Sequence, residues 1–179
     1  MKKTFLFLLL AGLLVTTGSC EEEDLLSGSC DLPHNTAPSG LQGGWANGFT
    51  SFTQILDAYT GKFQGYTWSS AKYFNFTPDG KGADFYYMAN GQYSQSATKA
   101  TGTIQFDEGS TAQSGSFTFH ACKGHYKGWG SVSVDRDATE QELRSNLTKR
   151  YYYEMQGDWL RIEPGGPVTA YSSSFRKVD

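Results

Sequence analysis

The sequence predicts an all-β protein: a single antiparallel meander β-barrel of about eight strands with one short helix. Three observations support this fold class. Short segments alternate apolar and polar residues, turn residues separate nearly all of them, and strands do not alternate with helices as they would in a parallel α/β protein. The same pattern also fits an OB-like barrel or a β-sandwich, so these stay open as alternatives.

The first residues have the order of an export signal. Lys2 and Lys3 precede an apolar run over residues 5–15, and four small residues lie at 16–19, directly before Cys20. The apolar run is shorter than the roughly 20 residues that span a bilayer. Residues 1–19 are therefore predicted to be a signal peptide that is removed.

A cysteine directly after such a cleavage site resembles a bacterial lipobox. The resemblance implies cleavage before Cys20, a diacylglyceryl thioether on its sulfur, and an anchor in outer-membrane lipid. The acidic run at 21–24 resembles the signal that exports lipoproteins of Bacteroidota-type bacteria to the cell surface. The alternatives are an ordinary secretory signal, and a solvated acidic segment on a lipoprotein that faces the periplasm.

Residues 20–40 are predicted to be an acidic, flexible tether, because they lack periodicity and are rich in polar residues, glycine and proline. The barrel domain is predicted to cover residues 41–179. Loss of the signal peptide removes Lys2 and Lys3 and no acidic residue, so the net charge falls from −3 to −5. This charge argues against a nucleic-acid partner, which needs a basic surface.

The strands follow one another at close spacing. The turn Pro78-Asp79-Gly80 joins the first clear hairpin, because proline presets φ and glycine tolerates positive φ. About nine candidate strands are expected in all, over residues 45–52, 73–77, 83–88, 101–106, 116–121, 130–134, 151–155, 158–163 and 170–175.

One helix is expected over residues 137–147. Thr139 and Glu142 have the spacing of a capping box, in which each side chain bonds to the other residue's backbone amide. Leu143 and Leu147 lie four residues apart and can pack one face of this helix on the barrel.

If lipid occupies Cys20, then Cys30 and Cys122 are the two cysteines left. The compartment outside the inner membrane permits oxidation, so a disulfide between Cys30 and Cys122 is predicted. Two buried free thiols are the alternative.

The triplet Gly43-Gly44-Trp45, at the entry to the first strand, together with an arginine near the C-terminus, resembles the lipocalin-like (calycin) barrels. In that family the tryptophan closes one barrel end and an arginine of the last strand packs over its ring. The resemblance implies that Trp45 and Arg176 have these roles here, joined by a cation–π contact.

Aromatic residues make up 15% of the chain. The inward positions of the expected strands are bulky, which favours a small barrel filled with side chains over a large open cavity. These positions are Phe74, Phe76, Ile104, Phe106, Phe117, Phe119, Tyr151 and Tyr153.

No motif of catalysis or cofactor binding is present, and we expect neither enzymatic activity nor a cofactor. His120, Cys122 and His125 have a spacing that can supply zinc ligands, but a disulfide would consume the thiol and no fourth ligand is evident. We therefore expect no metal site.

Aromatic residues also occur in two segments that are predicted to be loops. Rigid Tyr, Trp and Phe side chains among glycine and serine are typical of protein-binding loops, although rings that fold back over the barrel ends would give the same composition. The candidate partner-binding residues are Phe63, Tyr66, Trp68, Tyr126 and Trp129.

These features predict a non-enzymatic surface lipoprotein that binds another protein through its barrel loops. The most specific version is an inhibitor of a secreted or surface protease, by analogy with bacterial β-barrel protease-inhibitor lipoproteins. Segments 31–40 and 59–70 are the candidates for the part of the chain that would occupy the cleft of the protease. The alternatives are a lipocalin-like carrier of a small apolar ligand and a structural lipoprotein of outer-membrane assembly.

Overall fold

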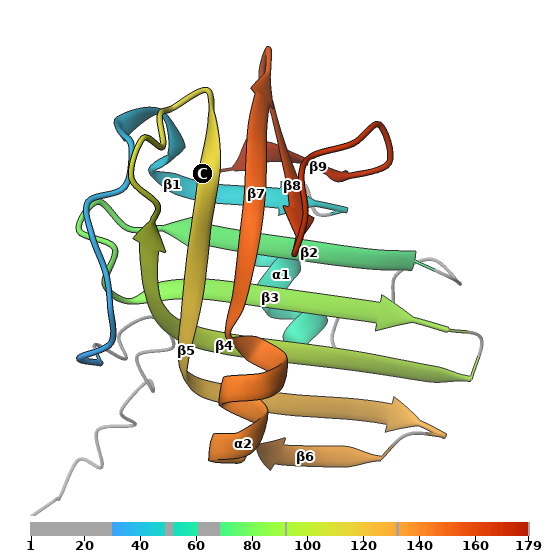
Figure 1. Ribbon diagram of the computed structural model, residues 1–179. Coiled ribbons are helices and arrows are strands. Elements are labelled where there is room, and N and C mark those ends of the chain that lie inside the picture. Colours follow the sequence, from blue (N-terminus) through green and yellow to red (C-terminus); the bar gives the residue numbers. More distant parts are fainter. Residues whose placement is uncertain (1–29, 49–51, 61–68, 92, 132, 179) are drawn as a thin grey trace, which may run out of the picture.

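Eight antiparallel strands close into a barrel in the computed structural model of the protein, which describes residues 30–48, 52–60, 69–91, 93–131 and 133–178. The sheet closes because β5 pairs with both β4 and β7, and β1 pairs with both β2 and β9 (Figure 1). The predicted all-β barrel is confirmed, and its architecture is compatible with a lipocalin-like fold. The barrel strands are β1 (Gly43–Asn47), β2 (Ser69–Phe76), β3 (Ala83–Asn90), β4 (Ser94–Phe106), β5 (Ser114–Gly130), β7 (Lys149–Gln156), β8 (Trp159–Pro164) and β9 (Ser173–Val178).

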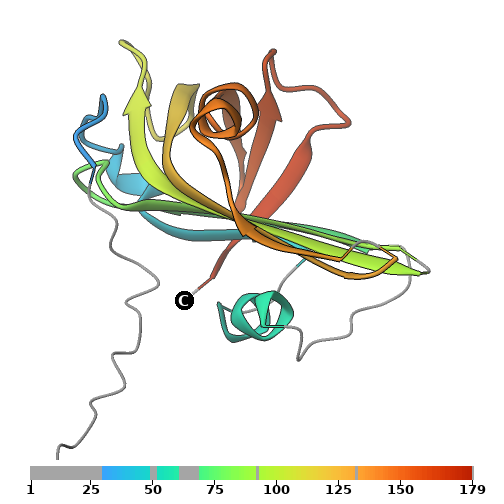
Figure 2. The same ribbon diagram turned by 90° about the horizontal axis from the view of Figure 1, so that it is seen from below.

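The long strand β5 takes part in two arrangements. Its first part pairs with β7 in the barrel wall, and its last part pairs with the short edge strand β6 (Val134–Asp137). Between the two parts, the register with β4 shifts at Thr101/Gly102 and leaves Cys122 without a paired residue. A β-bulge of this kind bends a strand and increases its twist. The ends of β2 to β5, with β6, therefore project past the barrel as a flat extension (Figure 2), which we call the shelf (residues 69–72, 87–90, 94–98, 126–130 and 134–137).

The interior of the barrel is filled with aromatic side chains. All eight residues that the sequence predicts to point inward are buried in one cluster with Trp45, Leu160, Ile162 and Phe175. Phe117 is completely buried at its centre, with ring centroids 5.2 Å from Phe76 and 5.3 Å from Tyr151. The prediction of a filled interior is thus confirmed for these positions.

The expected strand at 45–52 is wrong beyond Asn47. Gly48 has a φ of +82°, a left-handed conformation that ends the strand. The chain then forms helix α1 (Phe52–Tyr59), which lies against the outer face of the sheet (Figure 2). A second buried cluster on that face includes Tyr59, Tyr73, Tyr86 and Met88, so this face is covered as well.

The helix expected at 137–147 begins later and is short. The capping box of Thr139 and Glu142 is present, and it starts α2 (Glu140–Glu142), which continues as the π-helical turn η2 (Leu143–Leu147). Of the expected strand at 130–134, Gly130 is the last residue of β5 and Val134 is the first residue of β6, while Val132 lies outside the described residues.

Residues 30–38, which the sequence predicts to be part of the tether, lie along the barrel and are hydrogen-bonded to it. We call this segment the strap, and the 3-10 helix η1 (Ser39–Leu41) follows it. The backbone N–H of Asn35 donates to Ile104 O at 3.2 Å, and that of Ala37 donates to Pro78 O at 3.1 Å. Residues 20–29 of the expected tether lie outside the described residues.

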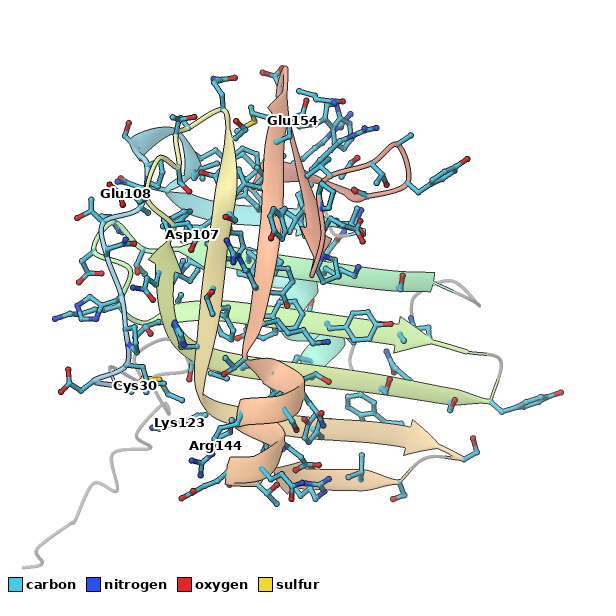
Figure 3. The ribbon with its side chains drawn as sticks, viewed as in Figure 1. Cys30, Asp107, Glu108, Lys123, Arg144 and Glu154 are labelled. Atoms are coloured by element: carbon cyan, nitrogen blue, oxygen red, sulfur yellow. A yellow bond between two sulfur atoms is a disulfide. The ribbon has the colours of Figure 1, made fainter. Side chains whose placement is uncertain are left out.

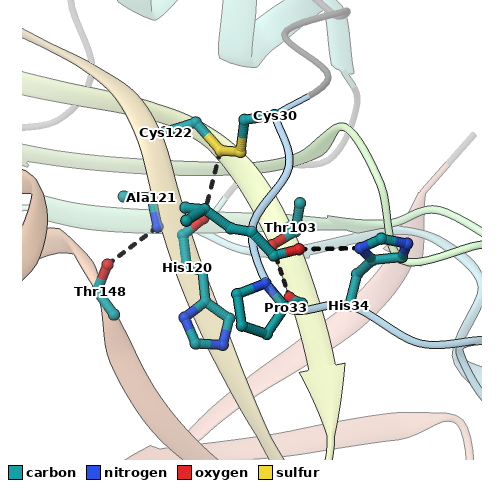
Figure 4. The surroundings of a disulfide bond; sticks show 9 residues. Cys30, Pro33, His34, Thr103, His120, Ala121, Cys122 and Thr148 are labelled. Carbon is teal, nitrogen blue, oxygen red and sulfur yellow. Dashed lines mark hydrogen bonds between the residues drawn. A yellow bond between two sulfur atoms is a disulfide. The ribbon is translucent and has the colours of Figure 1, made fainter.

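The strap is also covalently tied to the barrel. Cys30 and Cys122 lie at disulfide distance, with Cα atoms 6.1 Å apart, as predicted (Figure 4). The unpaired bulge position of Cys122 is the point at which the strap is attached. Among the described residues, no helix is long and apolar enough to cross a bilayer.

Candidate functional site

A pocket of about 310 Å³ opens at the end of the barrel where the shelf begins. Its deeper wall is apolar and belongs to the barrel core, whereas its rim is polar. Different strands and η2 all contribute to it. The lining residues are Lys72, Phe74, Phe85, Tyr87, Thr98, Asn146, Leu147, Lys149, Tyr151, Ile162, Pro164, Ser173 and Phe175.

The pocket exists because the walls separate at this end. β7 begins at Lys149, opposite Phe119, while β5 continues past this point to pair with β6. The η2 turn fills part of the gap, and Leu147 is buried there against the core. The space that remains lies between η2, the shelf and the first residues of β7 and β9.

The opposite end of the barrel is closed. Trp45 is buried, and its indole Nε1 donates to the carbonyl oxygen of Leu41 in η1 at 2.7 Å. Leu41 is itself completely buried in the core cluster. Among the described residues, access to the aromatic interior is therefore from the shelf end.

The rim carries two cationic side chains on facing walls. Lys72 lies on β2 and Lys149 begins β7. The ammonium of Lys72 donates to Ser173 Oγ at 2.9 Å. No acidic residue lines the pocket in the part of the chain that the structure describes, and the labelled carboxylates of Asp107, Glu108 and Glu154 lie toward the other ends of β4, β5 and β7 (Figure 3).

The ionisable side chains of the described lining are those of Lys72, Lys149, Tyr87 and Tyr151. No His, Cys, Asp or Glu belongs to this described part of the lining. Burial raises the pKa of Tyr151, so this residue offers the pocket a neutral phenol.

The predicted contact between Trp45 and Arg176 is not present. Arg176 instead packs over Trp159, with its guanidinium carbon 4.1 Å from the ring centroid, because β9 places Arg176 on the outer face beside β8. Lys177 Nζ lies 5.8 Å from the centroid of Trp45, its neighbour across β1 and β9. A cation thus lies over the tryptophan, but from the residue after the predicted one.

Of the candidate partner-binding residues, the two that the structure describes lie on opposite faces of one strand. Tyr126 and Trp129 lie in strand β5 and not in a loop. Tyr126 packs toward the barrel core and carries the Arg136 guanidinium over its ring at 5.2 Å, whereas Trp129 packs against the cluster under α1, on the other face. Phe63, Tyr66 and Trp68 lie outside the described residues.

His125 and Cys122, two of the candidate zinc ligands, have other partners in the structure. Both ring nitrogens of His125 lie 2.7 Å from carboxylates, one of Asp135 and one of Asp137, while Cys122 is held by Cys30. Across the described ranges, no three His, Cys, Asp or Glu residues are grouped so that they can hold a metal ion.

Sequence reasoning missed the two lysines of the rim. A usable signal was nevertheless present, because side chains two residues apart in a strand share a face. Lys72 continues the inward row of Phe74 and Phe76, and Lys149 continues that of Tyr151 and Tyr153. A cation two residues before the first inward ring of two core strands indicates an open, polar barrel end.

Gly124 leaves space for Leu147, which lines the pocket, and we expect Gly124→Ala to disturb this packing. A Cβ atom at this position would lie 2.5 Å from Leu147 Cδ1 and 2.9 Å from Ala138 Cβ. Overpacking of this kind costs about 1–3 kcal/mol, which urea unfolding measures. Gly166→Ala is the matched control, since a Cβ there meets nothing within 4 Å. Equal stability of the two variants would contradict this packing of η2 on β5.

Asp84 is a buried carboxyl outside the pocket, on the outer face below Tyr86. It is completely buried, and its Oδ1 has no hydrogen-bond partner among the described residues. Burial raises the pKa of Asp84 to about 7, although a hydrogen bond from Asn75 and the charge of Lys99 act in the opposite direction.

This carboxyl makes stability depend on pH. The folded state binds the Asp84 proton more tightly than the unfolded state, so the free energy of unfolding should fall as pH rises from about 4 to about 7, by at most about 4 kcal/mol. We expect Asp84→Asn to reduce this slope and to stabilise the protein above about pH 7. Urea unfolding at several pH values tests this; an unchanged slope in the variant would refute it.

Comparison with protein-family models, curated proteins and solved structures finds no match for this chain.

Proposed function

We propose that the protein is a non-enzymatic binding protein that takes a small, mostly apolar molecule into the pocket at the shelf end of the barrel. The pocket is the observation that carries this proposal. Its volume of about 310 Å³ lies at the lower end of the range of roughly 300–1,000 Å³ that small-molecule sites occupy. Its apolar wall faces a few polar groups at the rim, which is the usual composition of such sites.

The aromatic filling of the barrel limits the size of the ligand. Phe117 and its neighbours occupy the centre of the interior, so the ligand cannot run the length of the barrel. A molecule that fills the pocket would displace about ten waters, from the roughly 30 Å³ that each occupies in the liquid. We therefore expect a compact ligand with up to about three rings, or with a short acyl chain.

The test is titration with the neutral fluorescent probe phenylnaphthylamine, whose emission rises in apolar surroundings. We expect saturable binding by one probe per protein. Thr98→Trp places a large side chain in the lining and should abolish binding, whereas Gln105→Trp places the same ring on an exposed position of the same strand and should not. No saturable binding by the wild type, or equal binding by both variants, would overturn the proposal.

A protein partner is a second candidate, favoured by the strap. This segment is exposed over much of its length, with Leu32 37% exposed. It is nevertheless held in place by Cys30 and by backbone bonds of Asn35 and Ala37. A segment that is already ordered loses little conformational entropy when it binds a partner. A protease inhibitor needs such a segment to occupy the cleft of the protease. Assays for inhibition of, and complex formation with, the proteases secreted by the producing bacterium test this version, and a uniformly negative result would exclude it.

We also propose that the mature protein is anchored in the outer membrane through lipid on Cys20, facing the cell surface. The support is the order of residues 2–24 in the sequence. The full-length protein should partition into the detergent phase after Triton extraction, and Cys20→Ser should move to the aqueous phase. Identical partitioning of the two forms would contradict lipidation at this residue, and loss of the protein from intact cells on protease treatment tests the surface orientation.

A further inference from the structure

The rim of the pocket concentrates positive charge in a protein that is acidic as a whole. Lys72 and Lys149 are the only charged residues among the described residues of the pocket lining, while the full chain has a net charge of −3. Neither lysine forms an ion pair with a carboxylate of the described residues. The two cations on facing walls repel each other, and no acidic side chain of the lining compensates for them.

The two ammonium groups retain donors for a ligand. A lysine has three N–H donors, and Lys72 uses one for Ser173 Oγ at 2.9 Å. Lys149 is exposed at the start of β7, and the Asn146 side chain lies in the lining on the same side. A group with several acceptor oxygens can therefore receive hydrogen bonds from both walls.

The positions of the lysines in their strands direct these cations toward the apolar wall. Lys72 is two residues before Phe74, and Lys149 is two residues before Tyr151, so each lysine shares the inward face of its strand with a ring of the pocket. A bound molecule would thus contact aromatic surface in the deeper part of the pocket and ammonium groups at its opening. Ion pairs at such a partly apolar rim are stronger than in bulk water.

We propose that the ligand of this pocket is an amphipathic organic anion. Its apolar body lies against Phe74, Tyr151 and Phe175, and its carboxylate or sulfonate head lies at the rim between Lys72 and Lys149. This inference rests on the proposed function and adds to it the charge and orientation of the ligand.

The test compares two probes with the same ring system, anilinonaphthalene sulfonate and neutral phenylnaphthylamine. We expect the anionic probe to bind the wild-type protein at least about tenfold more tightly, because its sulfonate accepts charge-assisted hydrogen bonds from the two ammonium groups. The double variant Lys72→Met/Lys149→Met should bind both probes with similar affinity. Lys81→Met, in the exposed turn before β3, is the control and should keep the preference.

A measurement on the wild-type protein alone tests the proposal even if the variants do not fold. Raising the salt concentration should weaken binding of the anionic probe and leave the neutral probe nearly unchanged, because exposed charges are screened. Equal affinities for the two probes, or a preference that survives in the double variant, would overturn the anionic ligand while leaving the proposed pocket in place. Binding of neither probe would overturn the proposed function itself.

Discussion

Replacing Phe117 with alanine should destabilise the folded protein by about 3–5 kcal/mol, the usual cost of removing a buried aromatic ring. Phe117 is completely buried, and its ring centroid lies 5.2 Å from that of Phe76 and 5.6 Å from that of Phe106. Loss of the ring removes these contacts and leaves a cavity that the closed sheet can fill only in part. The free energy of unfolding in urea measures the effect.

Tyr171→Ala is the matched control for this prediction. The Tyr171 side chain is 98% exposed, and substitutions at such surface positions usually change stability by less than about 0.5 kcal/mol. A loss below about 1 kcal/mol for Phe117→Ala would mean that the aromatic cluster is not the stabilising core of the barrel.

The double substitution Cys30→Ser/Cys122→Ser should lower the free energy of unfolding by up to about 4–5 kcal/mol, the chain-entropy estimate for a disulfide that closes a long loop. The two residues are separated by 92 positions, so the bond greatly restricts the unfolded chain. The bond also holds the strap, whose residues Asn35 and Ala37 make backbone hydrogen bonds to the barrel. Urea unfolding gives the global effect, and hydrogen exchange at these two amides gives the local one.

Reduction of the wild-type protein supplies the control for the disulfide. Treatment with dithiothreitol should lower the unfolding free energy by the same amount as the double substitution and should not change the double variant. A double variant as stable as the oxidised wild type, with unchanged exchange at Asn35 and Ala37, would contradict the attachment of the strap by this bond.

The barrel could be predicted because the sequence pattern of each strand lies within a few consecutive residues. Alternating segments and turn residues identify strands one at a time, and inward residues such as Phe74 and Tyr151 follow from the two-residue period. Helix α1 was missed although its signal is present, since Phe52, Ile55, Leu56 and Tyr59 have helical spacing. The strand expected over residues 45–52 overlaps the first residue of this helix, because Gly48 was not recognised as the end of the strand.

The strap and the pocket were not predictable in the same way. Residues 30–38 have the composition of a linker, and their hydrogen bonds go to residues about 40 to 70 positions away, such as Pro78 and Ile104. The pocket depends on where β5 leaves β7, which is set by the bulge at Cys122. Neither feature has a short sequence motif, because each results from pairing between distant segments.

The most direct test of the binding site is an amide chemical-shift map of the protein titrated with anilinonaphthalene sulfonate. The account predicts that the largest shifts cluster at Lys72, Tyr87, Thr98, Asn146 and Ser173, the rim of the pocket. Shifts concentrated instead at the strap or around the exposed Trp159, with the rim unchanged, would contradict it.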